Sequence, residues 1–575
     1  METPATPTVS RIAVPTPSAS QIPSPHYATT RRHSLYGTED RVVIDPGSRV
    51  WKVGFSGEGR PREVFVTVGG KDGTSLWSSS SQGNKSNSER EEDQIILSHR
   101  LQDILRSIFF DSLLTDPRSR KVILVEHPML QLAVKEALAQ VMFENLQIPS
   151  ISFAPSHVLA MMAAGRLTGL VLDCGYLEST VVPIYGSRPL YSAMRTSPLA
   201  GARLNTHLRS LLMLFGTYLG PMGVVGQNPK PSAVPEDALP ESIIEDMKTR
   251  CCFVGSPILL SRSLPRLQGP SESAATEDLM SVDQSETSTD VDPGQPSSQS
   301  RTSDSSMTGP STQIHAMKDL YVRHSTATDL NVKIPAPGMA PTGPGTTTFT
   351  RASLLVPGWI RERAAELLFE DGDVDEASVA EVILDSLLKV PVDLRKEFAS
   401  SIVVAGGTCM LPGFIPRLQA ELIRLLSPPL RNTLNVDDPA VTEASHPPSK
   451  LSPPIYDVYA PLRPLSPHIA ILNNPDPPAT QSTLARAHAG RAPAFAPAAL
   501  QWIGASLAGA MKTGGEEITR EKWDEALEDV FENTPSAPVP VSPGSAGSNP
   551  RKGFIIPDWT RIPLSQGAPS VHTPA

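Results

Sequence analysis

The chain has 575 residues with a formal charge of -10, and 58 of the residues are proline, about twice the usual share. An acidic balance without a basic tract argues against nucleic acid as the main partner, because phosphate binding is driven by clustered lysine and arginine. Four cysteines without a C-x-x-C motif exclude a disulfide scaffold and a cysteine-based zinc module.

Two uncharged stretches, Ser210–Pro229 and Ala492–Met511, raise the question of a membrane span. A spanning helix needs about 20 strongly apolar residues. These stretches are instead rich in glycine or alanine, and both contain proline. We therefore expect no membrane span.

Segments of low complexity divide the chain. They are rich in proline, serine and threonine, so they bury too little apolar surface to offset the entropy lost on ordering. We therefore expect one mid-sized folded body with long insertions. We interpret the serine- and threonine-rich insertions as passive loops, with phosphorylation platforms as the alternative. The segments are 1–38, 76–92, 264–316, 432–454, 463–497 and 534–550.

Between these segments, predicted strands alternate with predicted helices. Short runs of valine and isoleucine bounded by turn residues predict strands, and apolar residues recurring every three or four positions predict helices. The alternation predicts an α/β fold. In chain order, the predicted strands are Arg41–Asp45, Trp51–Phe55, Val122–Val125, Leu170–Asp173, Ser179–Ile184 and Ile402–Ala405, and the predicted helices lie in 95–110, 134–146, 241–254, 414–426, 503–511 and 520–531.

Two of the predicted hairpins repeat one pattern. In each, an apolar strand ends in an aspartate (Asp45 or Asp173), and a glycine follows two residues later (Gly47 or Gly175). Two such hairpins facing each other would place backbone N–H groups around a polyphosphate. The carboxylates would then hold a hydrated Mg²⁺, and Lys52 would reach a phosphate. Taken singly, an Asp-x-Gly turn is more often an ordinary turn, and that alternative stays open.

A third glycine-rich turn follows the predicted strand Ile402–Ala405. Gly406 and Gly407 would let a flat ring approach the backbone closely, although a Gly-Gly pair before a helix is usually only a tight connection. We interpret the two histidines near predicted strand ends, His127 and His157, as hydrogen-bonded structural residues rather than catalytic groups or metal ligands.

Several of these segments resemble the actin family. IDPGSRVWKVGFSGEGRPREVF (44–65) resembles the first phosphate loop of actins, and SIVVAGGTCMLPGFIPRL (401–418) resembles the segment beside the adenosine. The similarity runs discontinuously from about Arg41 to Ala526. Within the family, SISFAPSHVLAMM, VLDCGYLESTVVPIYG, SVAEVILDSLLKVPVD and a late IPDW are similar to the actin-related protein 10 family, numbered 11 in vertebrate dynactin.

The resemblance implies a two-lobed α/β fold of the type shared by actins, heat-shock chaperones and sugar kinases, with duplicated β-sheet cores. The implied organisation is a disordered tail over 1–38, a first lobe over 39–186 with the insert 76–92, a second lobe over 187–425 with the insertion 264–316, C-terminal elements over 426–533 with the insertions 432–454 and 463–497, and a linker with the IPDW tail over 534–575.

By the same resemblance, the expected cofactor is ATP or ADP with Mg²⁺. Asp45 and Asp173 are expected to contact the metal through water. The residues expected at the nucleotide are Asp45, Gly47, Ser48, Lys52, Asp173, Gly175, Lys248, Gly406, Gly407, Thr408 and Met410.

Several positions depart from the actin pattern. Arg49 stands where actins have glycine, and Tyr176 begins the replacement of an Asp-Gly pair in the second loop. Ser156 and Thr180 stand where actins carry a glutamine and a histidine near the attacking water. Because phosphoryl transfer depends on positioning and electrostatics, we expect a degenerate ATPase site without catalytic residues, in which any nucleotide is structural.

The stretch after the first hairpin is short. Only residues 68–94 separate the first predicted sheet from the predicted helix at 95–110. We therefore expect the lobe that binds the next subunit in actin filaments to be much smaller here. The resemblance then implies a non-catalytic subunit that caps the pointed end of the actin-like filament of dynactin and supports dynein-driven transport on microtubules.

The implied partners are the subunits of that filament and the other pointed-end subunits, with dynein as an indirect partner. The implied location is the cytoplasm and the cytoskeleton. Two alternatives stay open at this point: a nuclear actin-related protein of a chromatin-remodelling complex, and an active actin-like ATPase.

Overall fold

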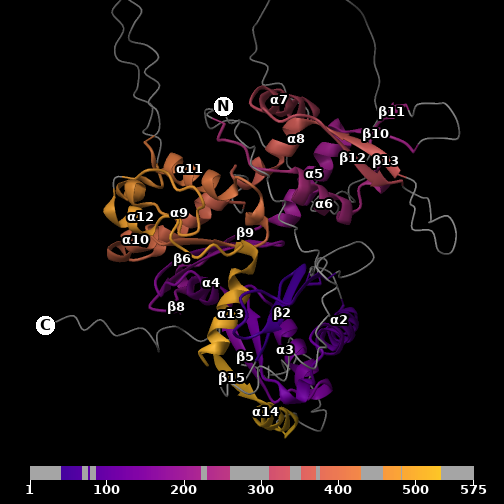
Figure 1. The fold of residues 1–575 in the computed structure, drawn as a ribbon, viewed down its shortest axis with the longest axis vertical. Coiled ribbons are helices and arrows are strands. Elements are labelled where there is room, and N and C mark those ends of the chain that lie inside the picture. Colours follow the sequence, from indigo (N-terminus) through magenta and orange to yellow (C-terminus); the bar gives the residue numbers. More distant parts are fainter. Residues whose placement is uncertain are drawn as a thin grey trace, which may run out of the picture.

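The computed structural model describes residues 41–67, 76–77, 86–221, 230–258, 310–336, 351–370, 376–428, 457–480, 482–513 and 515–532. These residues form sheets and helices arranged in two lobes (Figure 1), so the predicted α/β fold is confirmed. The predicted low-complexity segments 1–38, 432–454 and 534–550, and the IPDW tail, lie outside the described residues.

The first lobe is built on a mixed sheet. Its elements are β1 Val42–Pro46, β2 Val50–Phe55, β3 Glu63–Val66, β4 Val122–Glu126, β5 Ser150–Pro155, β15 Glu516–Thr519, α2 Asn87–Ser107, α3 Leu132–Gln140 and α14 Arg520–Glu532, with the short helices η1 Ile108–Ser112, η2 Pro117–Ser119 and η3 Val141–Asn145. The described strands run in the order β15, β5, β4, β1, β2, β3. β1, β4 and β5 are parallel neighbours, and their apolar runs suit strands that are covered on both faces.

The second lobe contains two sheets. Its elements are β6 Gly169–Cys174, β7 Ser179–Tyr185, β8 Arg188–Pro189, β9 Arg195–Ser197, β10 Thr217–Leu219, β11 Pro231–Ser232, β12 Leu330–Pro335, β13 Arg351–Val356, β14 Ile402–Ala405, α5 Gly201–Phe215, α6 Glu241–Cys251, α7 Pro310–Arg323, α8 Gly358–Arg363, α9 Val379–Lys389, α10 Val392–Ala399, α11 Phe414–Leu426 and α12 Thr483–His488, with η4 Tyr191–Ala193, η5 Glu236–Ala238, η6 Ala364–Leu368, η7 Thr408–Met410, η8 Ala460–His468 and η9 Pro497–Ala499. In the described residues, one sheet has the order β14, β6, β7, β8 with β9 on β7, and the other has the order β11, β10, β13, β12.

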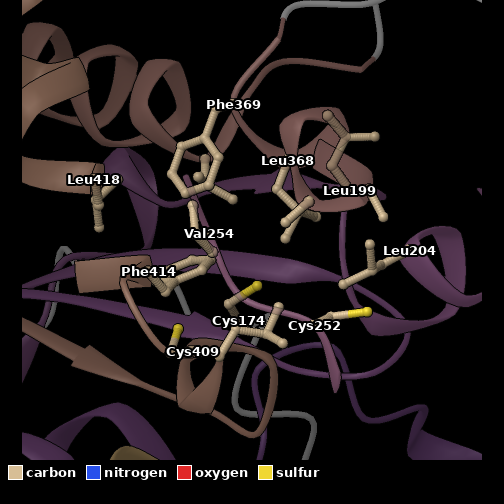
Figure 2. Close-up of a cluster of buried hydrophobic side chains, with 14 of the residues drawn as sticks. Cys174, Leu199, Leu204, Cys252, Val254, Leu368, Phe369, Cys409, Phe414 and Leu418 are labelled. Atoms are coloured by element: carbon tan, nitrogen blue, oxygen red, sulfur yellow. The ribbon is translucent and has the colours of Figure 1, made fainter. Parts of the chain in front are cut away.

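The core of the second lobe lies against β6 and β14. Figure 2 shows part of it, where Cys174 and Cys409 lie with Val254, Phe414 and Leu418. All four cysteines of the chain are buried thiols that form no disulfide. They therefore serve as small apolar core residues.

Two helices fill the space between the two lobes: α4 Ser156–Ala163 and α13 Leu500–Ala510. Their apolar side chains share one core with residues of β1, β4, β6 and β14. A methyl group at Gly504 would lie 1.9 Å from the carbonyl oxygen of Leu159, so α13 can approach α4 this closely only with glycine there. The indole N–H of Trp502 donates to the carbonyl of Val43 at 3.3 Å. This helix pair therefore connects the first sheet to the second.

The prediction that 463–497 does not fold is wrong. η8 extends into it as far as His468, α12 lies inside it, and Leu465, Ile469 and Ile471 are buried. The N–H of Leu472 donates to the carbonyl of Ile402 at 2.7 Å, which adds the segment to the edge of β14. The prolines are tolerated because this segment forms a 3₁₀ helix and an extended edge, where few backbone donors are needed.

Three predicted boundaries also move. The helix expected from residue 95 begins at Asn87, because Ser86 and Glu89 form a capping box, and this removes part of the insert 76–92. The insertion 264–316 ends earlier, since α7 begins at Pro310. The first lobe ends before residue 186, because β6 and β7 pair with β14 in the second sheet.

A buried ionic network ties α11 to η6 and α8. Arg417 forms two hydrogen bonds with Glu366, at 2.9 and 2.7 Å, in the forked geometry that favours arginine–carboxylate pairs. Arg363 donates to the same carboxylate at 2.8 Å. Arg417 and Glu366 are 6% and 2% exposed, so neither charge has water as an alternative partner.

We expect Glu366→Ala to lower the free energy of unfolding by about 3–5 kcal/mol, because it removes the carboxylate that two buried guanidinium groups share and leaves each with one carboxylate partner, Glu421 or Glu362. The matched control is Asp246→Ala, which breaks the exposed Arg250–Asp246 pair and should cost at most about 1 kcal/mol. Denaturant unfolding of the two variants measures the difference. Equal losses would contradict a structural role for the buried network.

Candidate functional site

A cavity of about 570 Å³ lies between the two lobes. Residues that follow β1, β4, β6 and β14 line it, which is where open α/β sheets place their ligands. The predicted nucleotide-site residues Gly47, Ser48, Lys52, Asp173, Gly175, Lys248, Gly406, Gly407, Thr408 and Met410 all line the cavity. The remaining predicted residue, Asp45, is fully buried and bonded to Lys52, one of the lining residues.

A histidine joins the two aspartates across the cavity. The Nε2 atom of His127 lies 3.1 Å from Oδ1 of Asp45, and its Nδ1 atom lies 3.4 Å from Oδ2 of Asp173. Lys52 donates to the other oxygen of Asp45 at 2.7 Å. Sequence reasoning treated His127 as merely structural. Its position directly after β4, the parallel neighbour of β1, was the available signal, because carboxyl ends of parallel strands meet at one edge.

The pKa values of this cluster are strongly shifted. Burial alone would raise the pKa of Asp45, but Lys52 and His127 outweigh it and lower that pKa to about 2. Burial alone would lower the pKa of His127, but its hydrogen bonds to Asp173 and Asp45 raise that pKa to about 10. The pKa of Asp173 is lowered too, since contact with His127 outweighs burial. At neutral pH His127 is therefore an imidazolium between two carboxylates.

A second histidine, His157, is buried and contacts Thr180, which lines the cavity. Nδ1 of His157 lies 3.1 Å from the hydroxyl of Ser156, and Nε2 lies 3.0 Å from the hydroxyl of Thr180. Burial lowers the pKa of His157 to about 4, so this ring is neutral. Ser156 and Thr180 are the two positions predicted to have lost water-orienting groups, and both hydroxyls contact this one ring.

The two phosphate-loop residues predicted to depart from the actin pattern, Arg49 and Tyr176, contact each other. The Arg49 guanidinium lies 4.8 Å from the ring centre of Tyr176 and donates to its hydroxyl at 3.0 Å. Both side chains also reach Glu241 on α6, Arg49 at 3.3 Å and the Tyr176 hydroxyl at 2.8 Å. Arg49 belongs to the first lobe and its two partners to the second, so these contacts bridge the cleft.

Some of the backbone N–H groups predicted to surround a polyphosphate form hydrogen bonds within their own turns instead. The N–H of Gly47 donates to the carbonyl of Asp45 at 3.1 Å, and the N–H of Gly175 donates to the carbonyl of Glu178 at 3.0 Å. Lys248 is paired with Glu245 at 2.7 Å. Fewer donors therefore face a polyphosphate than the sequence pattern predicts.

The turn after β14 suits the flat ring predicted there. Gly406 has a φ of +101°, and a methyl group on it would lie 2.2 Å from the carbonyl oxygen of Cys174, so this position requires glycine. A methyl group on Gly407 would meet nothing within 4 Å, which leaves this residue open to the cavity. Met410 is 49% exposed beside it. This turn therefore leaves open space where the flat ring is predicted.

The carboxylates do not fit the predicted hydrated Mg²⁺. The ring of His127 contacts both of them and takes the space between them. Within the described residues, no group of three or more histidine, cysteine, aspartate or glutamate side chains is arranged to hold a metal ion. Asp45 and Asp173, the two residues expected at the Mg²⁺, both contact His127 in this structure.

Two further findings concern the family of the chain and its relation to membranes. A family model described as actin matches residues 37–440, which is more than half of the chain. Among the helices of the described ranges, none combines the length and apolar character needed to cross a membrane.

We expect folding stability to fall as the pH rises from about 6.5 to 10, because folded His127 keeps a proton that the unfolded chain releases. The contribution is fully present below pH 6.5 and disappears as the pH passes about 10, with a slope of about 1.4 kcal/mol per pH unit. Denaturant unfolding at several pH values should show this slope reduced in His127→Gln. The control His99→Gln, at an exposed position of α2, should keep it, and an unchanged slope in His127→Gln would refute the assignment.

Proposed function

Because the chain belongs to the actin family, we propose that it is a non-catalytic subunit that caps the pointed end of the actin-like filament of dynactin and so supports dynein-driven transport on microtubules. The family match supports the general type. The segments similar to the pointed-end actin-related protein, among them FAPSH (153–157) and LDCGY (172–176), support the specific assignment.

The observation that carries the capping proposal is the short connection after the first hairpin. β3 ends at Val66 at the edge of the described first sheet, and α2 already begins at Asn87. The connection from Val66 to Asn87 is shorter than the predicted connection over 68–94. It leaves little chain for the lobe with which a filament subunit grips its neighbour, so a subunit that docks at the filament end offers no equivalent surface for the next one.

The cleft supports the non-catalytic part of the proposal. Phosphoryl transfer needs a group that orients the attacking nucleophile, and at the two relevant positions Ser156 and Thr180 present short hydroxyls bonded to neutral His157. The bridge from Arg49 to Tyr176 further occupies the region between the two loops. We accordingly propose that ATP or ADP in this cleft is structural and is not turned over.

The proposed partners are the filament subunits and the other pointed-end subunits of dynactin, with dynein reached indirectly. The proposed location follows from them: the cytoplasm and the microtubule cytoskeleton. A chromatin-remodelling role and an active ATPase remain as outcomes of the tests below.

We expect affinity purification of the native protein, followed by mass spectrometry, to recover the dynactin filament and pointed-end subunits in stoichiometric amounts. A matched control is the Glu366→Ala variant, whose second lobe is expected to be destabilised and which should recover less of the complex. Recovery of chromatin-remodelling subunits, or of no stoichiometric partner, would reject the capping proposal.

We expect steady-state phosphate release from Mg-ATP by the purified protein to equal that of its Asp173→Asn variant, because neither has a group that orients the attacking water. The measurement is a coupled phosphate assay on both proteins, with equal folding checked by circular dichroism. Faster release by the unaltered chain would show an active ATPase and contradict the non-catalytic proposal.

A further inference from the structure

The two aspartates of the cleft lie on different sheets. Asp45 is in β1, and Asp173 is in β6, where it pairs with Ala405 of β14. His127 follows β4 and reaches both carboxylates, one with each ring nitrogen. The bridge between the carboxylates is thus made by a side chain of the chain itself.

The ring of His127 occupies the space between the two carboxylates. Its Nε2 atom lies 3.1 Å from Oδ1 of Asp45, within hydrogen-bond distance, and its Nδ1 atom lies 3.4 Å from Oδ2 of Asp173. Lys52 occupies the other oxygen of Asp45 at 2.7 Å. A Mg²⁺ ion requires oxygen ligands in near-octahedral geometry and keeps several waters. Between these carboxylates it would instead meet the ring of His127 and, beside it, the side-chain nitrogen of Lys52.

We propose that the side chain of His127 takes the place of a divalent cation in this cleft, so that the cleft receives a nucleoside diphosphate without metal. This inference rests on the structural nucleotide proposed above and does not depend on capping. It differs from what the sequence pattern predicts, since two facing Asp-x-Gly hairpins predict a metal between their aspartates.

Two other basic side chains of the cleft are also paired with carboxylates of the chain. Arg49 pairs with Glu241 at 3.3 Å, and Lys248 pairs with Glu245 at 2.7 Å. The cleft therefore supplies both signs of charge from its own side chains. Arg49 and Lys52 line the cavity, so they are placed to meet phosphate oxygens directly.

The end of the cavity at the turn after β14 would receive the nucleoside. Gly407 is open to the cavity and Met410 is half-exposed there, while the Thr408 hydroxyl donates to the carbonyl of Gly175 and holds the turn in place at 2.7 Å. In this arrangement the base lies against Gly407 at one end of the cavity, and a short phosphate chain extends toward Arg49 and Lys52 at the other end. The bridge from Arg49 to Tyr176 leaves less room for a third phosphate, which is why we name a diphosphate.

The test measures Mn²⁺ and ADP binding to the full-length protein. Electron paramagnetic resonance counts bound Mn²⁺ without nucleotide in the unaltered chain, His127→Ala, the double variant His127→Ala/Asp173→Asn, and the control His99→Ala. His127→Gln, which keeps a side chain of similar reach, is included in case His127→Ala does not fold. Calorimetry then measures ADP binding with EDTA and with Mg²⁺.

We expect no bound Mn²⁺ in the unaltered chain or in His99→Ala, one bound ion in His127→Ala or His127→Gln, and its loss in the double variant. We expect the affinity of the unaltered chain for ADP to be the same within about twofold in EDTA and in Mg²⁺, and that of His127→Ala to rise at least about tenfold with Mg²⁺, which corresponds to about 1.4 kcal/mol.

Three results would overturn the inference. Mn²⁺ bound by the unaltered chain and lost in the double variant would show a metal site that coexists with His127. No Mn²⁺ bound by either folded His127 variant would show that the ring is not what excludes the ion. Absence of ADP binding under both conditions would overturn the diphosphate and the structural nucleotide together, while the purification result alone decides the capping proposal.

Discussion

The close contact between α4 and α13 is the constraint on which the cleft depends. Gly504 allows the two helices to touch at the backbone of Leu159, and one sheet packs on each side of the pair. A larger residue would separate the sheets, because the interior is close-packed and has no room to absorb a methyl group. With the sheets held at this spacing, the ends of β1 and β6 are near enough for one imidazole to bond with Asp45 and Asp173 together.

The departures from the family pattern are coupled to one another. Arg49 and Tyr176 each replace residues of a phosphate loop, and they contact each other and share Glu241. Ser156 and Thr180 likewise meet at His157. The hydrogen bonds from Arg49 to Tyr176 and Glu241 cross the cleft, which fits a subunit whose lobes are held together by its own residues.

The sequence predicted the local features of this protein well and the long-range contacts poorly. The strands around Asp45 and Asp173 follow from short apolar runs and turn residues, which are local signals. The bond of His127 to Asp45 joins residues 82 positions apart, and no local pattern encodes it. The folding of 463–497 was missed because its prolines suggested disorder, whereas burial of Ile469 and Ile471 against the second sheet decides its structure.

The last strand of the described chain, β15, completes the sheet of the first lobe. β15 pairs with β5, and Glu517 reaches Arg41, Lys121 and Ser150 of the same lobe. The second lobe lies between these parts in sequence, so its two sheets and their helices are synthesised before β15 exists. Domains usually fold as units from the amino terminus during translation. In this chain the amino-terminal sheet keeps an open edge at β5 until residues 500–519 have left the ribosome, and it is the last of the sheets to be completed.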